Sequence, residues 1–232
     1  MTDSSMATEF SIDARVQGLA LGVVEASGLR VAPSSPELRA YCDEVARRAG
    51  TGGLRGGEER RSAVRELLRR GGFKPAGRSK PAQEYLLRTV TQDGGLPAIS
   101  NAVDLINAVS LDCALPISLL AGERAGRQLI IRYGEPGESY VFNRAEQRLD
   151  VHGLVCVCGI EETKSIPLGS PVKDSMRAKI TETDGHAIAC IYAPQPAVNA
   201  EELRGWADRL GTGLVRWCQA TGYGVRILPA TW

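Results

Sequence analysis

The hydrophobic residues of this chain follow two patterns, short unbroken runs and positions three or four apart. Unbroken apolar runs bounded by glycine, proline or polar turn residues predict core strands. They cover residues 17–26 (QGLALGVVEA), 128–133 (QLIIRY), 154–158 (LVCVC) and 187–192 (AIACIY). The segment 139–143 is the expected antiparallel partner of 128–133 across the turn at 134–137, and residues 225–228 are an expected edge strand.

Helical spacing, together with helix-start residues, predicts the helical segments. Ser35 precedes Pro36 and Asn199 precedes an amphipathic run, and both are favoured N-cap residues. The expected helices are 36–50, 58–70, 101–109, 200–221, and one from Pro81 to the glycines after Asp93. Since strands and helices alternate irregularly, we predict an α+β fold, with a mixed or antiparallel sheet core and flanking helices.

The predicted organisation is one main domain. The polar, acidic segment 1–14 is expected to be a disordered tail, and residues 15–193 to form the domain. Pro194-Gln195-Pro196 marks a boundary. Beyond it, residues 194–232 are expected to form a helix and an edge strand that pack on the same domain.

Composition narrows the function classes. With 232 residues, 43% hydrophobic and 24% charged, the chain is an ordinary globular protein. A net charge of +1 argues against a large nonspecific nucleic-acid surface. The sequence has no apolar run that could span a bilayer and no signal-peptide pattern, so we expect a cytoplasmic protein without membrane partners. Two histidines exclude a histidine-rich metal site, and no metal or cofactor is expected.

One region is strongly basic. Five arginines lie between positions 60 and 70, and Lys74, Arg78 and Lys80 follow. The region is either a solvated helix face or a surface that contacts nucleic-acid phosphates, where such residues position the ligand rather than read its sequence.

A polar stripe follows the predicted helix 101–109. Asn101, Asp104, Asn107 and Ser110 are three positions apart and carry no lysine or arginine among them. Such a stripe suits either a recessed site that hydrogen-bonds a polar ligand or a buried network that ties loops to the helix.

The same region carries a family resemblance. The ordered segments LLRTV, LPAISNAVDLINAVSL and LPIS, within residues 86–118, resemble the B3/4 domain of the phenylalanyl-tRNA synthetase β chain, above all its free-standing, single-domain relatives. The resemblance extends over about residues 18–193. It implies a B3/4-like fold that removes wrongly attached amino acids from tRNA by ester hydrolysis, which needs a positioned water and a stabilised oxyanion but no nucleophilic triad.

The resemblance also implies site residues. Asn107 falls on a pocket asparagine, Ser118 stands where the synthetase domain has histidine, and Cys190 lies near the place of a glutamate. Residues 159–174, which follow the strand 154–158 and are rich in hydroxyl groups, are expected to form a functional loop. Within it, Glu161 and Glu162 stand in place of the glycine-rich loop of the synthetase domain. The expected catalytic residues are Asn107, Ser118 and Glu162; the expected substrate-binding residues are Asn101, Asp104, Glu161 and Cys190; the expected tRNA-binding residues are Arg65, Arg69, Lys74 and Arg78.

Because the histidine and the glutamate are replaced, several functions stay open. A trans-acting deacylase of misacylated tRNA is one. An aminoacyl-tRNA-dependent transferase, a non-catalytic module that binds tRNA or an amino acid, and a relative that has lost activity are the others. His186, in the turn before the strand of Cys190, is a further candidate base.

Overall fold

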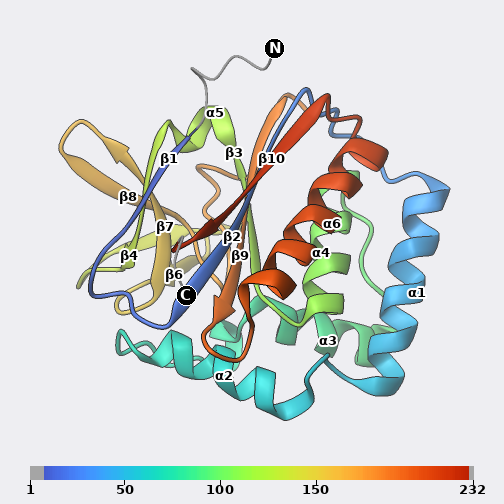
Figure 1. Cartoon of the computed structure of the whole chain (residues 1–232), viewed down its shortest axis with the longest axis horizontal. Coiled ribbons are helices and arrows are strands. Elements are labelled where there is room, and N and C mark those ends of the chain that lie inside the picture. Colours follow the sequence, from blue (N-terminus) through green and yellow to red (C-terminus); the bar gives the residue numbers. More distant parts are fainter. Residues whose placement is uncertain (1–7, 230–232) are drawn as a thin grey trace.

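Two four-stranded sheets lie face to face, and helices cover the outer face of one of them (Figure 1). The computed structural model describes residues 8–229. The central sheet has the order β10-β2-β9-β3, and the outer sheet has the order β1-β4-β7-β8. The central strands are β2 (Leu19–Ser27), β3 (Ile117–Ala121), β9 (His186–Pro194) and β10 (Gly222–Leu228), and every pairing among them is antiparallel.

The outer sheet is mixed. Its strands are β1 (Glu9–Ile12), β4 (Gln128–Tyr133), β7 (Val155–Glu161) and β8 (Lys164–Gly169). β1 runs parallel to β4, whereas the β4–β7 and β7–β8 pairs are antiparallel. A separate two-stranded hairpin joins β5 (Ser139–Val141) to β6 (Arg148–Asp150). The predicted α+β class with a mixed or antiparallel sheet core is therefore confirmed.

The core has two parts because neighbouring residues of a strand point to opposite faces of a sheet. Ile188, Cys190 and Tyr192 of β9 pack with side chains of the outer sheet such as Ile131. Ala189, Ile191 and Ala193 pack with the helices instead. The central sheet therefore separates an inter-sheet core from a helical core.

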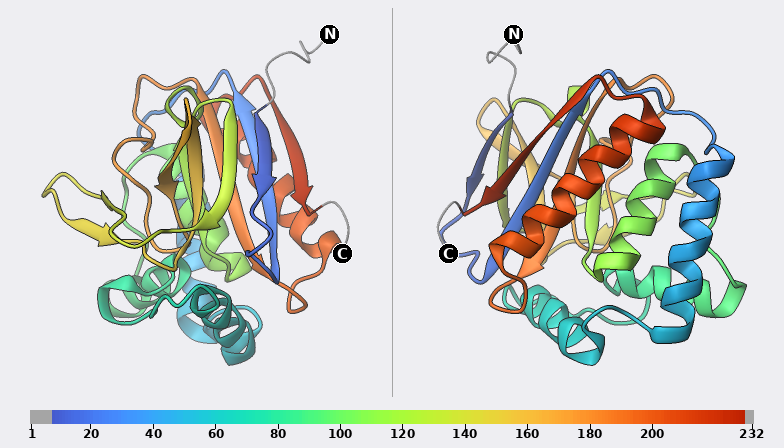
Figure 2. Two further views of the ribbon diagram at one scale, coloured as in Figure 1. Left: turned by 90° about the vertical axis from the view of Figure 1, so that its left-hand side faces the viewer. Right: turned by 45° about the vertical axis from the view of Figure 1, so that its right-hand side comes forward.

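Helices form the third layer (Figure 2). α4 (Asn101–Cys113) packs between α1 (Pro36–Gly52) and α6 (Ala200–Cys218), and α6 also packs on β2. α3 (Ala82–Asp93) contacts α1 and α4, while α2 (Gly57–Arg69) contacts β9. A 3-10 turn (Gly77–Ser79) and the short α5 (Gly122–Ala125) complete the helical elements of residues 8–229.

The expected helix starts are confirmed. The Ser35 hydroxyl accepts a hydrogen bond from Leu38 N, and the Asn199 side chain accepts one from Glu202 N. Both bonds satisfy backbone donors that a helix leaves free at its first turn.

Three sequence-based expectations are wrong. Residues 9–12, within the predicted tail, form β1, while residues 1–7 lie outside the described part of the chain. Residues 139–143 do not pair with β4, because β5 pairs with β6 and β4 lies between β1 and β7. The region 159–174, expected to be a loop, instead contains the end of β7 and all of β8.

Among residues 8–229, no helix combines the length and the apolar character that crossing a bilayer requires.

Candidate functional site

Asn101, the first residue of the polar stripe, has a structural role, because its side-chain amide is fully hydrogen-bonded within the protein. Its Oδ1 accepts hydrogen bonds from the backbone N–H groups of Ala32 (3.0 Å) and Ala102 (2.8 Å). Its Nδ2 donates to the carbonyl oxygens of Arg30 and Trp217, each at 2.9 Å. The amide has two donors and one carbonyl oxygen, so this buried side chain ties a loop and the end of α6 to α4.

Asp104 holds a second junction. Its buried carboxylate accepts from the Ser34 hydroxyl at 2.6 Å and from Ile99 N at 2.9 Å. Arg39 Nη1 lies 3.2 Å from the same carboxylate and neutralises it. Asn107, one turn further along α4, is half-buried and has no hydrogen-bond partner among the described residues.

Ser118 and Cys190 lie on the other side of the central sheet. They are register partners in the β3–β9 pair, which places their Cα atoms side by side. Cys190 belongs to the inter-sheet core, whereas α4 packs against the helical face. The structure therefore brings Ser118 and Cys190 together but separates them from Asn101 and Asp104 by the thickness of a sheet.

Ser118 is the centre of a buried hydroxyl cluster. Its Oγ donates to the carbonyl oxygen of Ser170 at 3.2 Å and lies 3.0 Å from Tyr192 Oη. Tyr140 Oη lies 2.8 Å from Ser170 Oγ on the far side of the cluster. Four hydroxyl groups from β3, β5, β9 and the segment after β8 thus meet between the two sheets.

Asp174 supplies the one carboxyl group of this cluster. Its Oδ2 accepts from Leu119 N at 2.9 Å, but its buried Oδ1 has no hydrogen-bond partner. Burial raises the pKa of Asp174 to about 6, although the neighbouring Ser118 hydroxyl and the Leu119 N–H act in the opposite direction. A buried carboxylate oxygen without a partner is unfavourable for folding and is a common feature of functional sites.

Gly169 makes room for this arrangement. A Cβ atom at this position would lie 2.8 Å from Asp174 Oδ1 and 3.0 Å from Ser118 Oγ. The two oxygen atoms therefore face the same small space above the β8 backbone. We call Ser118, Tyr192, Ser170, Tyr140 and Asp174 the Ser118 cluster.

Glu161 and Glu162 lie apart from that cluster. Both are exposed at the tip of the β7–β8 hairpin, where Glu162 adopts a left-handed backbone with φ of 53°. Glu161 forms an exposed ion pair with Arg177. Neither carboxylate contacts Ser118 or Cys190.

Cys190 is enclosed in the core, and the His186 ring is paired with a carboxylate. Complete burial raises the pKa of the Cys190 thiol far above its ordinary value, so the thiol stays protonated. His186 Nε2 lies 3.0 Å from Glu25 Oε1, and this hydrogen bond raises the pKa of His186. Four strand residues, or about 13 Å, separate His186 from Cys190.

The basic region of α2 is largely paired. Arg65 donates two hydrogen bonds to Glu84, at 2.7 and 2.6 Å, and these bonds raise the pKa of Arg65. Arg69 lies 3.7 Å from Glu66 on the surface. Only Lys74 and Arg78, of the four expected tRNA contacts, are exposed and lack an ion pair among residues 8–229.

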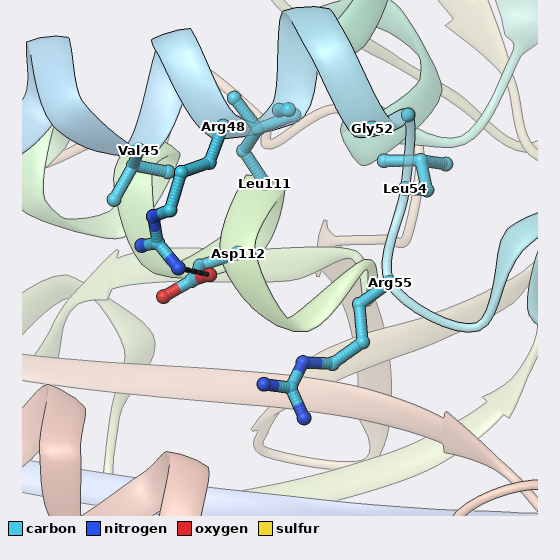
Figure 3. Close-up of a pocket in the computed structure, with 9 residues that line it drawn as sticks. Val45, Arg48, Gly52, Leu54, Arg55, Leu111 and Asp112 are labelled. Atoms are coloured by element: carbon cyan, nitrogen blue, oxygen red, sulfur yellow. Dashed lines mark ion pairs between the residues drawn. The ribbon is translucent and has the colours of Figure 1, made fainter.

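Two cavities lie in the helical layer rather than at the Ser118 cluster. One, of about 340 Å³, is lined by α1, α4 and the loop after α1 (Figure 3). The other, of about 500 Å³, lies between α1 and α6. Neither is lined by a residue of the sequence-predicted site. Within residues 8–229, no group of three or more histidine, cysteine or acidic side chains could hold a metal ion.

Sequence reasoning missed Asp174, Ser170, Tyr140 and Tyr192. Ser170 and Asp174 do fall in the hydroxyl-rich segment 159–174, whose prolines and acidic residues signalled a functional loop. Tyr192 ends an apolar strand and Tyr140 lies on a short hairpin, so neither has a local signal.

Comparison with known proteins gives no independent identification, because no protein-family model matches the chain and no curated protein matches it.

Proposed function

We propose that this protein hydrolyses the ester bond of misacylated tRNA in trans, with a fold of the B3/4 type and the Ser118 cluster as its reaction centre. The observation that carries the proposal is the unpartnered Asp174 Oδ1 beside the Ser118 hydroxyl. The pairing of Ser118 with Cys190 also supports it, since the family resemblance assigns these two positions to one pocket.

Asp174 has the properties of a general base. With a pKa of about 6 it is ionised at neutral pH, yet basic enough to accept a proton from water. Oδ1 takes a water proton while the water oxygen adds to the ester carbonyl carbon. When the tetrahedral intermediate collapses, the carboxyl group returns the proton to the ribose hydroxyl that leaves.

The hydroxyl groups around Asp174 supply the remaining part of the chemistry. Ser118 and Tyr192 carry O–H groups 3.0 Å apart, and either can donate to the oxyanion of the intermediate. Cys190 remains a neutral wall of the site. The Ser118 side chain is fully buried, so the ester reaches this centre only after part of the surrounding structure opens while Asp174 stays beside Ser118.

The decisive experiment measures the loss of labelled amino acid from a panel of correctly charged and mischarged tRNAs. We expect selective turnover by the wild type, and a loss of at least about 100-fold in Asp174→Asn, which keeps the shape of the side chain. Asp93→Asn is the matched control, since Asp93 is exposed at the end of α3.

Asn107→Ala separates this site from the one expected from the sequence. If Asn107 lined the reaction pocket, its truncation would abolish turnover. The Ser118 cluster lies across the central sheet from α4, so we expect Asn107→Ala to retain most of the activity. Activity lost with Asn107→Ala and kept with Asp174→Asn would overturn the assignment.

A second candidate is a non-catalytic binding module. The observation that favours it is the presence of two cavities in the helical layer, away from the Ser118 cluster. Ligand binding without ester turnover by the wild type, over the whole tRNA panel, would select it. Turnover only in the presence of an added amine would instead select an aminoacyl transferase.

A further inference from the structure

Arginine and aromatic side chains alternate along the groove between α1 and α6. The guanidinium of Arg209 lies 5.3 Å from the ring centre of Trp206 and 5.5 Å from that of Tyr41. Tyr41 stacks on Trp217 with ring centres 5.1 Å apart. Arg216 lies over Trp217 at 5.2 Å, and Arg55 lies over Trp206 at the same distance. The rings hold the flat guanidinium groups in fixed places.

Both cavities open beside these arginines. Arg48, Arg55 and Asp112 line the smaller one, and Arg209, Arg216 and Glu37 line the larger one. We call the two cavities together the arginine groove. Asp112 joins them, because Arg48 lies 3.2 Å from one of its carboxylate oxygens and Arg209 lies 3.0 Å from the other.

Hydrogen-bond donors greatly exceed acceptors in the arginine groove. Four arginines face two carboxylates among the lining residues, which gives a net charge of +2, and Arg216 donates a hydrogen bond to Glu37. Arg48 and Arg209 each approach Asp112 through one Nη atom, and Arg48 Nε also lies 3.6 Å from Glu44, so the remaining N–H groups of both arginines are available. The indole N–H of Trp217 is shielded from water and has no partner.

Open backbone next to Arg48 and Arg55 leaves space for a ligand. Gly52 and Gly53 line the smaller cavity, and a Cβ atom at either position would meet no atom within 4 Å. Figure 3 shows Arg48 against Asp112 and Arg55 extended beside them without an ion pair. An anion with several acceptor oxygens meets Arg48 and Arg55 in the smaller cavity and Arg209 and Arg216 in the larger one.

We propose that the arginine groove is a phosphate-binding site, which takes the phosphate groups of a nucleotide, free or within RNA. Each phosphate group has several acceptor oxygens and a negative charge, which match the excess of N–H donors and the positive charge of the groove. A carboxylate ligand has only two acceptor oxygens and fits the donor set less well. The proposal stands apart from ester hydrolysis, because the groove lies on the helical side of the central sheet.

Calorimetric titration tests the site with four probes, namely inorganic phosphate, AMP, adenosine and a hexameric oligoadenylate. We expect saturable binding of at least one phosphate-bearing probe and none of adenosine. Binding of AMP as tight as that of the oligonucleotide indicates a free nucleotide. Binding of the oligonucleotide alone, with a steep dependence on salt, indicates RNA.

The double variant Arg48→Gln/Arg209→Gln should lower the affinity for the phosphate-bearing probe at least about tenfold. Arg47→Gln is the matched control, because Arg47 lies on α1, pairs with Glu44 and does not line the groove. Trp217→Phe keeps an aromatic ring beside Tyr41 and removes the indole N–H together with the five-membered ring, so it tests the site if the double variant does not fold. We expect a several-fold loss from it.

If none of the phosphate-bearing probes bound saturably, the proposal would be overturned. Equal affinities of the wild type and both groove variants for the same probe would overturn it too. Asp174→Asn keeps the arginine groove intact and should bind as the wild type does. A failure of ester hydrolysis and a failure of phosphate binding are therefore distinguishable.

Discussion

At the scale of single residues, the Ser118 cluster resembles an active site because it contains a group, the Asp174 carboxylate, whose burial is unfavourable for folding. The Asp174 carboxyl group lies among hydroxyls and leaves Oδ1 without a partner, although a neutral side chain would be favourable there. The polar residues of α4 differ in this respect. Asn101 bonds only to backbone groups, and Asp104 bonds to Ile99 N, the Ser34 hydroxyl and Arg39, so the fold alone explains their burial.

Asp174→Asn should therefore stabilise the protein at neutral and basic pH while it removes hydrolysis. Burial raises the pKa of Asp174 from 3.8 to about 6, so between these values the folded protein keeps a proton that the unfolded chain has released. The carboxyl group is thus least unfavourable below about pH 4, and its destabilising effect is complete above about pH 6. We expect a gain of about 1–2 kcal/mol in the free energy of unfolding at pH 8.

Urea unfolding of wild type and variant at about pH 8 and about pH 4 provides the measurement. The gain should be present at the higher pH and shrink at the lower one. A variant that is less stable than the wild type at pH 8 would show that the Asp174 carboxylate contributes favourably to the fold.

At the scale of elements, continuous apolar runs and helix caps are predictable because their causes are local. The strand with AIACIY and the Ser35 and Asn199 caps lie where the sequence placed them. The β7–β8 hairpin was missed because its turn carries Glu162 and Thr163, neither a usual turn residue, and Glu162 takes a positive φ. β1 was missed because only alternate positions are partly buried.

The candidate site was predictable only in part, for a related reason. The family resemblance singled out Ser118 and Cys190, and the register between β9 and β3, a strand that the sequence analysis did not predict, brings them together. Asp174, in the segment after β8, and Tyr140, on the β5–β6 hairpin, reach the same place by paths that depend on the packing of both sheets. No local sequence pattern encodes such a meeting.

Gly169→Ala tests how closely β8 approaches the site. The added methyl group would lie 2.8 Å from Asp174 Oδ1 and 3.0 Å from Ser118 Oγ, so one of the two must move. We expect a loss of about 1–3 kcal/mol in stability, as overpacking usually causes, together with lower hydrolytic activity.

Gly205→Ala is the matched glycine control for thermal unfolding and turnover. Gly205 lies inside α6, and a Cβ atom there would meet no atom within 4 Å. This variant should gain up to about 1 kcal/mol from helix propensity and leave activity unchanged. If Gly169→Ala behaved in the same way, the close approach of β8 would have no functional role.

At the scale of the whole molecule, the central sheet is shared by two cores. Its β9 strand contributes Tyr192 to the inter-sheet core and Ile191 to the helical core. Arg60 of α2 binds Glu202 of α6 through two hydrogen bonds of 3.0 Å, which links the lower helix to the helical layer. Loss of either core therefore exposes one face of the same sheet.

We expect the three layers to unfold together in a single transition. In a Trp232→Phe background, which leaves Trp206 and Trp217 of the helical layer as the two tryptophans, the fluorescence should follow the same denaturant curve as far-UV circular dichroism. Separate midpoints for the two signals would show that the outer sheet unfolds independently of the helices.

The buried cysteines can report which elements of the structure open. All six thiols are buried, and they occur on α1, α4, β7, β9 and α6, so each layer holds at least one. Burial raises the pKa of Cys42 to about 11 and that of Cys113 and Cys218 to about 12. An alkylating reagent modifies each thiol only after its element opens, because the thiolate is the reactive form. Peptide mass analysis of timed alkylation can then rank the elements by how often each one opens, without any engineered label.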